Sequence, residues 1–258
     1  MQALSRPAHH WGRHWSHPWA HDSARHGARH WIVGDVHGCA DSLQRLLQVL
    51  PADDRLVLCG DVINRGPQIQ RAMELAWSLV SSGRAVWLQG NHEAELVAEL
   101  ARGDGGGRDR LAGCDTYRQL GAPLCHLWQR RLAALPEVFA GRGWVATHAG
   151  FDPHTWQPDL HVRHPFWHAY DGRYGQVVVG HTPGKELRRH RQGSIVIVDT
   201  GACYGGKLSA YCPETGQVVQ VSGQSPPQRP PDLPAAMRDQ LAALQHRRPG
   251  QQLQSCQG

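Results

Sequence analysis

The chain has 258 residues, which is enough for one ordinary enzyme domain with tails and short for two full domains. Its formal charge is +5, but four Arg and one Asp lie in residues 1–31, and four Arg and two Asp lie in residues 222–258. The remaining 19 basic and 19 acidic residues cancel, which argues against a broad phosphate-backbone-binding face on the central part. No stable nucleic-acid partner is therefore predicted.

The cysteines and the apolar runs indicate the compartment. Seven Cys are scattered without a C-x-x-C pair, and no apolar leader segment opens the chain. A reduced, cytoplasmic location is therefore expected. No apolar run approaches the roughly 18–20 residues that span a bilayer, so no membrane partner is predicted.

The two ends of the chain differ in composition from the middle. Residues 1–30 are rich in His and Trp and are expected to form a disordered extension. Residues 222–258 are rich in Pro and Gln and are expected to form a tail. The folded domain is accordingly predicted at residues 31–221.

Short apolar strands and amphipathic helices alternate in the first half of this domain. Strands are predicted at 30–33, 55–59 and 85–88, and helical apolar stripes follow them over 43–50, 69–80 and 93–101. A Gly-rich surface loop at 103–107 and a helical region at 115–135 come next. Later strands are predicted at 143–147, 176–179, 194–198, 207–211 and 217–221. This order predicts an α/β sandwich of two mixed β-sheets flanked by helices.

Polar side chains follow five of the predicted strands at the point where each strand ends. The motifs are GDVHG at 34–38, GDVINRG at 60–66, GNHE at 90–93, HAG at 148–150 and GH at 180–181. A single Asp after Gly is commonly a turn residue, and a single His is usually a hydrogen-bonded structural residue. Turn and structural roles do not explain five such motifs at five strand ends. Open α/β folds build their sites at the carboxyl ends of strands. We therefore expect one shared site.

The ordered motifs resemble those of the calcineurin-like metallophosphoesterases, and specifically their phosphoprotein-phosphatase branch, over residues 31–212. The resemblance implies the metallophosphoesterase-type sandwich and two divalent metal ions. It places one ion on Asp35, His37 and Asp61, and the second on Asp61, Asn91, His148 and His181, with Asp61 shared. Carboxylate, amide and imidazole ligands suit Mn²⁺, which is the expected ion, and also Fe²⁺ or Zn²⁺.

The same resemblance assigns the residues that meet the substrate. Arg65, Asn91 and, on a looser alignment, Arg163 are expected to bind the phosphate, and His92 is expected to protonate the leaving group. Asn64 occupies the position of an Asp that orients the catalytic imidazole in many relatives. Asn64 is expected to accept a hydrogen bond from His92, and the His92 imidazolium is expected to be less stabilised than in those relatives.

The activity implied by the resemblance is hydrolysis of phosphate esters by metal-activated water. Only residues 151–180 separate Gly150 from His181, and this compactness favours a Ser/Thr phosphoprotein phosphatase of the small bacterial and phage type. The alternative is a hydrolase of diadenosine tetraphosphate or another nucleotide polyphosphate, whose members resemble the chain at GDVHGC and at DTGACYGG, which contains Tyr204. A non-enzymatic metal binder is a third interpretation, which the complete set of motifs disfavours. The oligomeric state is left open.

Overall fold

A computed structural model of the chain describes residues 20–21, 29–102 and 110–225. The first half alternates strands and helices as predicted: β2 (His30–Val33), α1 (Ala40–Val49), β3 (Arg55–Leu58), α2 (Ile69–Ser81), β4 (Ala85–Trp87), α3 (Asn91–Arg102) and α5 (Asp115–Ala133). The second half is mainly strands: β5 (Val138–Gly141), β6 (Trp144–Thr147), α6 (His164–Ala169), β7 (Gln176–Val179), β8 (Arg188–His190), β9 (Ile195–Ile197), β10 (Lys207–Tyr211) and β11 (Val218–Ser222). The sequence analysis did not predict β5, β8 and α6.

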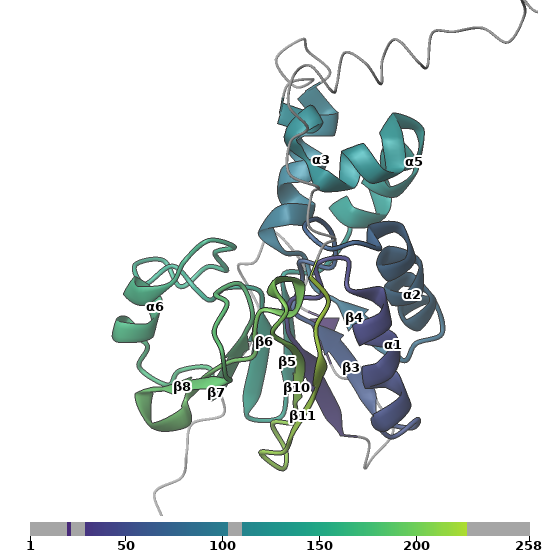
Figure 1. Cartoon of the computed structure of the whole chain (residues 1–258). Coiled ribbons are helices and arrows are strands. Elements are labelled where there is room, and N and C mark those ends of the chain that lie inside the picture. Colours follow the sequence, from purple (N-terminus) through teal and green to yellow (C-terminus); the bar gives the residue numbers. More distant parts are fainter. Residues whose placement is uncertain (1–19, 22–28, 103–109, 226–258) are drawn as a thin grey trace, which may run out of the picture. The chain divides into compact units, whose positions relative to one another are not determined.

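The strands form two mixed sheets, as Figure 1 shows. The five-stranded sheet has the order β11-β10-β2-β3-β4, in which β2, β3 and β4 are parallel and β10 is antiparallel to β2. The six-stranded sheet has the order β1-β5-β6-β7-β9-β8, in which β6, β7 and β9 are parallel. The predicted fold class, two mixed sheets flanked by helices, is confirmed.

Alternating side chains along each strand divide between three apolar cores. Leu56 and Leu58 of β3 face a core shared with α1 and α2, whereas Val57 faces the core between the two sheets. In β7 the pattern repeats, because Val178 faces the core between the sheets and Val177 faces the core that includes α6. The layers therefore run helix, sheet, sheet, helix, with α1 and α2 on one side and α6 on the other (Figure 1).

The ends of the domain include residues from both predicted tails. Ala20–His21 forms β1, which pairs in parallel with β5. At the other end the Gln224 side chain accepts hydrogen bonds from the backbone N–H groups of Asp41 (3.0 Å) and Ser42 (3.3 Å), which caps the start of α1. The predicted Gly-rich loop, most of the His/Trp-rich extension and the tail beyond residue 225 lie outside the described residues.

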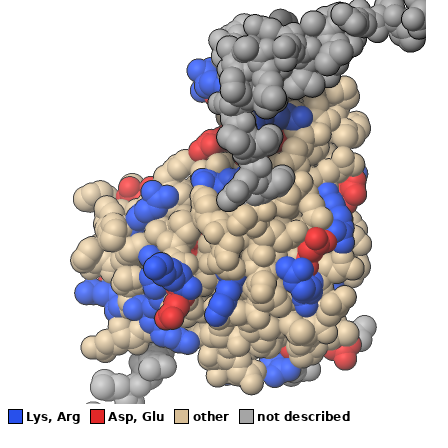
Figure 2. Space-filling view, viewed as in Figure 1, with Lys and Arg blue, Asp and Glu red and all other residues tan. Residues whose placement is uncertain are grey.

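None of the helices in the described residues is long and apolar enough to cross a bilayer. On the face shown in Figure 2, the Lys and Arg side chains are spread over several places, some of them beside Asp or Glu. They do not form one continuous band there, which is in keeping with the cancelling charges of the central segment.

Candidate metal centre

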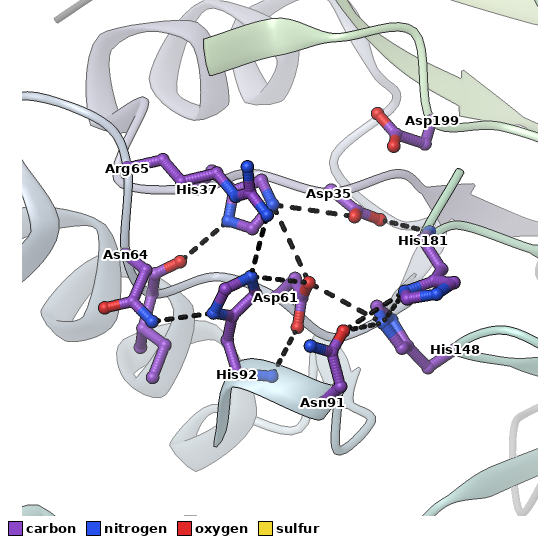
Figure 3. Close-up of polar contacts among 12 residues, drawn as sticks. Asp35, His37, Asp61, Asn64, Arg65, Asn91, His92, His148, His181 and Asp199 are labelled. Atoms are coloured by element: carbon purple, nitrogen blue, oxygen red, sulfur yellow. Dashed lines mark hydrogen bonds and ion pairs between the residues drawn. The ribbon is translucent and has the colours of Figure 1, made fainter. Parts of the chain in front are cut away.

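The strand ends of both sheets bring the predicted metal ligands together, as Figure 3 shows. Asp35, Asp61 and Asn91 lie just beyond β2, β3 and β4 of one sheet, and His148 and His181 lie just beyond β6 and β7 of the other. Every side chain of the predicted set is buried, with at most 9% of its surface exposed. The site therefore depends on the packing of the two sheets as much as on the motifs.

Asp61 lies at the middle of this cluster. Its Oδ2 atom is 3.6 Å from His37 Nε2, 3.6 Å from His148 Nε2 and 3.8 Å from His92 Nε2. Two groups of candidate ligand atoms, each with its members within 4.8 Å of one another, share this carboxylate: His37, Asp61 and His92 form one, and Asp61, His148 and His181 form the other. This position suits the bridging role that the family resemblance implies.

The His37 side chain is oriented so that its Nε2 atom faces the carboxylates of the first group. Its Nδ1 atom donates to the Ile63 carbonyl at 2.8 Å, which leaves the Nε2 lone pair directed at the carboxylates. Asp35 Oδ2 lies 3.7 Å from that nitrogen. Burial lowers the pKa of His37 to about 3, so the imidazole is neutral at physiological pH and can act as a ligand.

The second group is arranged in the same way. His148 Nδ1 donates to the Cys59 carbonyl at 2.7 Å, so its Nε2 lone pair faces Asn91 Oδ1 at 3.0 Å. His181 Nδ1 lies 3.1 Å from each of these two atoms. With Nδ1 facing these two atoms, the buried Nε2 can hold the proton while Nδ1 offers its lone pair. These donors fit a divalent cation of the Mn²⁺, Fe²⁺ or Zn²⁺ type.

The charges around the cluster also favour cations. Burial is the main cause that raises the pKa of Asp35 and of Asp61, and the neighbouring carboxylates Asp199 and Glu93 raise these pKa values further. Burial also raises the pKa of Glu93, and it raises that of Asp199 to about 6. Several buried carboxylates beside neutral imidazoles leave negative charge poorly compensated, and bound divalent ions relieve that cost.

The backbone at the site is strained. Five of the eight described non-glycine residues with positive φ belong to it, with φ values from 42° to 67°: His37, Asp61, Asn64, Arg65 and His181. Such a conformation costs about 1–3 kcal/mol for each residue and persists only where the surroundings enforce it. The strain indicates that the tertiary structure fixes the orientation of these side chains.

Glu93 is one of the groups that enforces this backbone, and the sequence analysis gave it no role. It is fully buried, and its carboxylate accepts hydrogen bonds from the N–H groups of Asp61 and Val62 at 2.8 Å and of Gly90 at 3.0 Å. A charged residue ending the GNHE motif was the available signal. Gly90 is required for a related reason, because a Cβ there would collide with Asp61 Oδ1.

Asn64 holds His92 in the opposite sense to the one predicted. Its Oδ1 accepts from the Thr116 N–H at 3.0 Å and from the Thr116 hydroxyl at 2.7 Å, and a backbone N–H can only donate. The amide orientation is thereby fixed, and Asn64 Nδ2 donates to His92 Nδ1 at 2.8 Å. The prediction that Asn64 accepts from His92 is therefore wrong. With Nδ1 accepting, the neutral imidazole carries its proton on Nε2, the atom that faces the cluster.

Arg65 lies on the other side of the same imidazole. Its Nη2 atom is 3.1 Å from His92 Nε2, and its Nη1 donates to the Tyr204 hydroxyl. Burial first, and the Arg65 charge second, lower the pKa of His92 to about 4. Both nitrogens of His92 thus face a donor, and a neutral imidazole accepts at only one of them, so the Arg65 contact is not a hydrogen bond while Asn64 Nδ2 donates to Nδ1.

A cavity of about 270 Å³ opens over the cluster, lined by His37, Asp61, Arg65, Asn91, His161, Arg163, His181, Pro183, Asp199 and Tyr204. Arg163 thus reaches the site, and its Nε donates to the Thr182 hydroxyl at 3.2 Å. His161, Pro183 and Asp199 were not among the predicted site residues, although Asp199 opens the DTGACYGG segment after a predicted strand. All ten predicted site residues lie in or beside this cavity.

The family model described as calcineurin-like phosphoesterase matches residues 28–197 of the chain. The chain belongs to this family. The expected family is thereby confirmed, and with it the class of hydrolase in which divalent metal ions act on phosphate esters.

Curated relatives of this calcineurin-like phosphoesterase are named symmetrical bis(5′-nucleosyl)-tetraphosphatases. The protein from Ralstonia nicotianae is 32% identical over 148 residues, which are 54% of this chain and 50% of the relative. The protein from Xylella fastidiosa is 35% identical over 128 residues, which are 48% of this chain and 42% of the relative. The alignment thus spans half or less of the length of these relatives.

Solved structures agree on the fold. A protein provisionally named a diadenosine tetraphosphatase has a TM-score of 0.60 at 23% identity, covering 79% of this chain and 97% of its own. A serine/threonine phosphatase from Saccharomyces cerevisiae has a TM-score of 0.54 at 12% identity, covering 84% of this chain and 85% of its own. At these identities the likeness concerns the fold alone.

The contact between Thr116 of α5 and Asn64 gives a testable prediction. Thr116 is fully buried, and its hydroxyl accepts from the Asn64 N–H at 3.0 Å while donating to Asn64 Oδ1. Thr116→Val leaves a buried donor and acceptor without this partner, so unfolding in urea should require about 1–3 kcal/mol less free energy. Thr155→Val, at an exposed hydroxyl, is the matched control. Equal stability of the two variants would contradict the role of Thr116.

Proposed function

We propose that this calcineurin-like phosphoesterase hydrolyses a phosphoanhydride bond of a dinucleoside tetraphosphate or a related nucleotide polyphosphate. The sequence-based preference was a phosphoprotein phosphatase, with nucleotide-polyphosphate hydrolysis as the alternative. The names of the curated relatives support the alternative over that preference. The geometry at His92 supports it independently.

The hydrogen bond from Asn64 to His92 Nδ1 is the observation that carries this proposal. A Ser or Thr alkoxide is a strong base and needs a proton as it leaves, which an imidazolium provides well. Asn64 brings no negative charge and presents a donor to Nδ1, so it disfavours the imidazolium of His92. A nucleoside diphosphate is a much weaker base than an alkoxide and leaves as an anion. A neutral Nε2–H that donates a hydrogen bond is sufficient for such a leaving group.

The two arginines of the cavity also suit a polyphosphate. Arg65 lies beside His92, and Arg163 lies beside Thr182, the residue after His181, so the guanidinium groups are held by different ends of the ligand cluster. Two separate guanidinium groups can bind charges on more than one phosphate. The proposed metal pair is two Mn²⁺ ions on the predicted ligand set. These ions would supply Lewis-acid activation of water and neutralise phosphate charge.

The proposal is tested by comparing two substrates. Metal-stripped protein reconstituted with Mn²⁺ should hydrolyse diadenosine tetraphosphate with a kcat/KM at least about 10-fold above that for a phosphoserine peptide, since the weak general acid penalises the alkoxide. EDTA should abolish both activities. Faster release of phosphate from the peptide would restore the phosphoprotein-phosphatase interpretation. Bound metal without turnover of either substrate would favour a non-enzymatic binder.

A further inference from the structure

Tyr204 is an exposed aromatic side chain at the edge of the cavity. Among the described residues, four large apolar side chains are strongly exposed, namely Val49, Leu127, Tyr204 and Val218, and of these Tyr204 lines the cavity. Its exposed fraction is 57%. An exposed ring beside a polar, metal-type cluster is a feature that phosphate binding by itself does not require.

The turn that carries Tyr204 is held firmly while the ring stays exposed. The ring belongs to the short helix η2 (Ala202–Tyr204), between Gly201 and Gly205, which have left-handed φ values of 71° and 79°. The Tyr204 N–H donates to the Gly201 carbonyl at 3.0 Å, and the Gln224 N–H donates to the Ala202 carbonyl at 2.9 Å. An aromatic ring on a fixed backbone loses little conformational entropy when a ligand covers it.

The ring is also tied to the phosphate-binding arginine. Arg65 donates through Nη1 to the Tyr204 hydroxyl, and its guanidinium carbon lies 5.6 Å from the ring centroid. A nucleoside attached to a phosphate on Arg65 therefore begins within reach of this ring. His161 also lines the cavity, but its ring lies 6.2 Å from that of His181, at the side of the metal ligands.

We propose that Tyr204 is a specificity-determining residue that stacks on a nucleobase of the substrate. The inference rests on the proposed function, because only a nucleotide substrate offers a base. In this arrangement Arg65, together with divalent ions on the predicted ligand set, would bind the phosphate chain, and Tyr204 distinguishes nucleoside polyphosphates from phosphate compounds that lack a base.

Binding of two ligands that differ in the base tests the inference. Isothermal titration of the full-length, Mn²⁺-loaded protein with ADP and with inorganic pyrophosphate gives a ratio of two Kd values. Tyr204→Leu should raise the Kd of ADP about 10-fold relative to the Kd of pyrophosphate, the size of effect that removing an aromatic stack on one base produces. Tyr204→Phe and Tyr204→Trp should keep the ratio, because both retain an aromatic face. Leu127→Ala, at an exposed apolar side chain outside the cavity, is the control and should keep both Kd values.

The outcomes separate this inference from the proposed function. Equal weakening of ADP and pyrophosphate in Tyr204→Leu would mean that Tyr204 acts only through Arg65, and would overturn the inference. An unchanged Kd for ADP would overturn it as well. Tyr204→Gln, which has similar reach but no aromatic face, repeats the test if Tyr204→Leu does not fold. Failure of the wild-type protein to hydrolyse diadenosine tetraphosphate would contradict the proposed function, whereas the ratio of Kd values is measured without turnover.

Discussion

Asp61→Asn is expected to lower kcat on diadenosine tetraphosphate by at least about 10³-fold, the effect of losing several kcal/mol of metal-dependent stabilisation of the transition state. Asp61 Oδ2 lies 3.6 Å from the ligand nitrogens of both His37 and His148, so one carboxylate serves both groups of ligands. The amide of Asn cannot supply the negative charge that two bridged cations would require. Metal analysis of the dialysed protein should show that the variant retains fewer Mn²⁺ ions than the wild type.

The same substitution should not destabilise the metal-free protein. Burial and the Glu93 carboxylate raise the pKa of Asp61 above its ordinary value in the folded state. The associated stability is therefore present at low pH and is lost as the pH rises from the ordinary pKa through the raised one. The amide that replaces the carboxyl group in the Asp61→Asn variant does not become a buried anion at pH 8, so the metal-free Tm of this variant should equal or exceed that of the wild type. Mn²⁺ should then raise the Tm of the wild type more strongly.

A matched control for Asp61→Asn is Asp171→Asn. Asp171 is exposed and pairs with Arg173 at 2.8 Å, outside the ligand cluster. This variant should retain the metal content and the activity of the wild type. Full turnover and an unchanged metal content in Asp61→Asn would rule out the bridging role of Asp61.

Asn64→Asp is expected to raise hydrolysis of a phosphoserine peptide relative to diadenosine tetraphosphate by about 10²-fold, the lower end of what general-acid catalysis contributes. Oδ1 of the new carboxylate can still accept from Thr116, so its second oxygen would face His92 Nδ1 where Asn64 Nδ2 now lies at 2.8 Å. A carboxylate there stabilises the imidazolium and raises the pKa of His92 from about 4.

The pH dependence of kcat on the peptide distinguishes this effect from a change in binding. An imidazolium acts as the general acid only below its pKa, so the variant should gain a limb on which kcat falls as the pH rises through the new pKa of His92. His92→Asn in the same background should remove this limb. Gln217→Glu, the same amide-to-carboxylate change in an exposed turn, is the control. A profile for Asn64→Asp that coincides with the wild type would refute the role assigned to Asn64.

Local patterns in the sequence predicted most of the fold and the position of the site. The short apolar runs of β2 and β3 and the apolar stripes of α1 and α2 reflect the geometry of buried strands and of helices, which repeats over a few residues. The motifs at the strand ends predicted the candidate ligands for a related reason, because parallel strands bring their carboxyl ends to one edge of a sheet. The compact spacing between His148 and His181 was less informative, because loop length does not determine which phosphate compound is bound.

The amino-acid sequence by itself therefore determined the family, the sandwich fold and the set of predicted ligands. Only the tertiary structure decided that Glu93 holds the backbone of Asp61, that Thr116 fixes the Asn64 amide, and that Tyr204 meets Arg65. Thr116 lies 52 residues after Asn64, and Tyr204 lies 139 residues after Arg65. The direction of a hydrogen bond and the meeting of distant side chains depend on how whole elements pack, and no local period in the sequence records that packing.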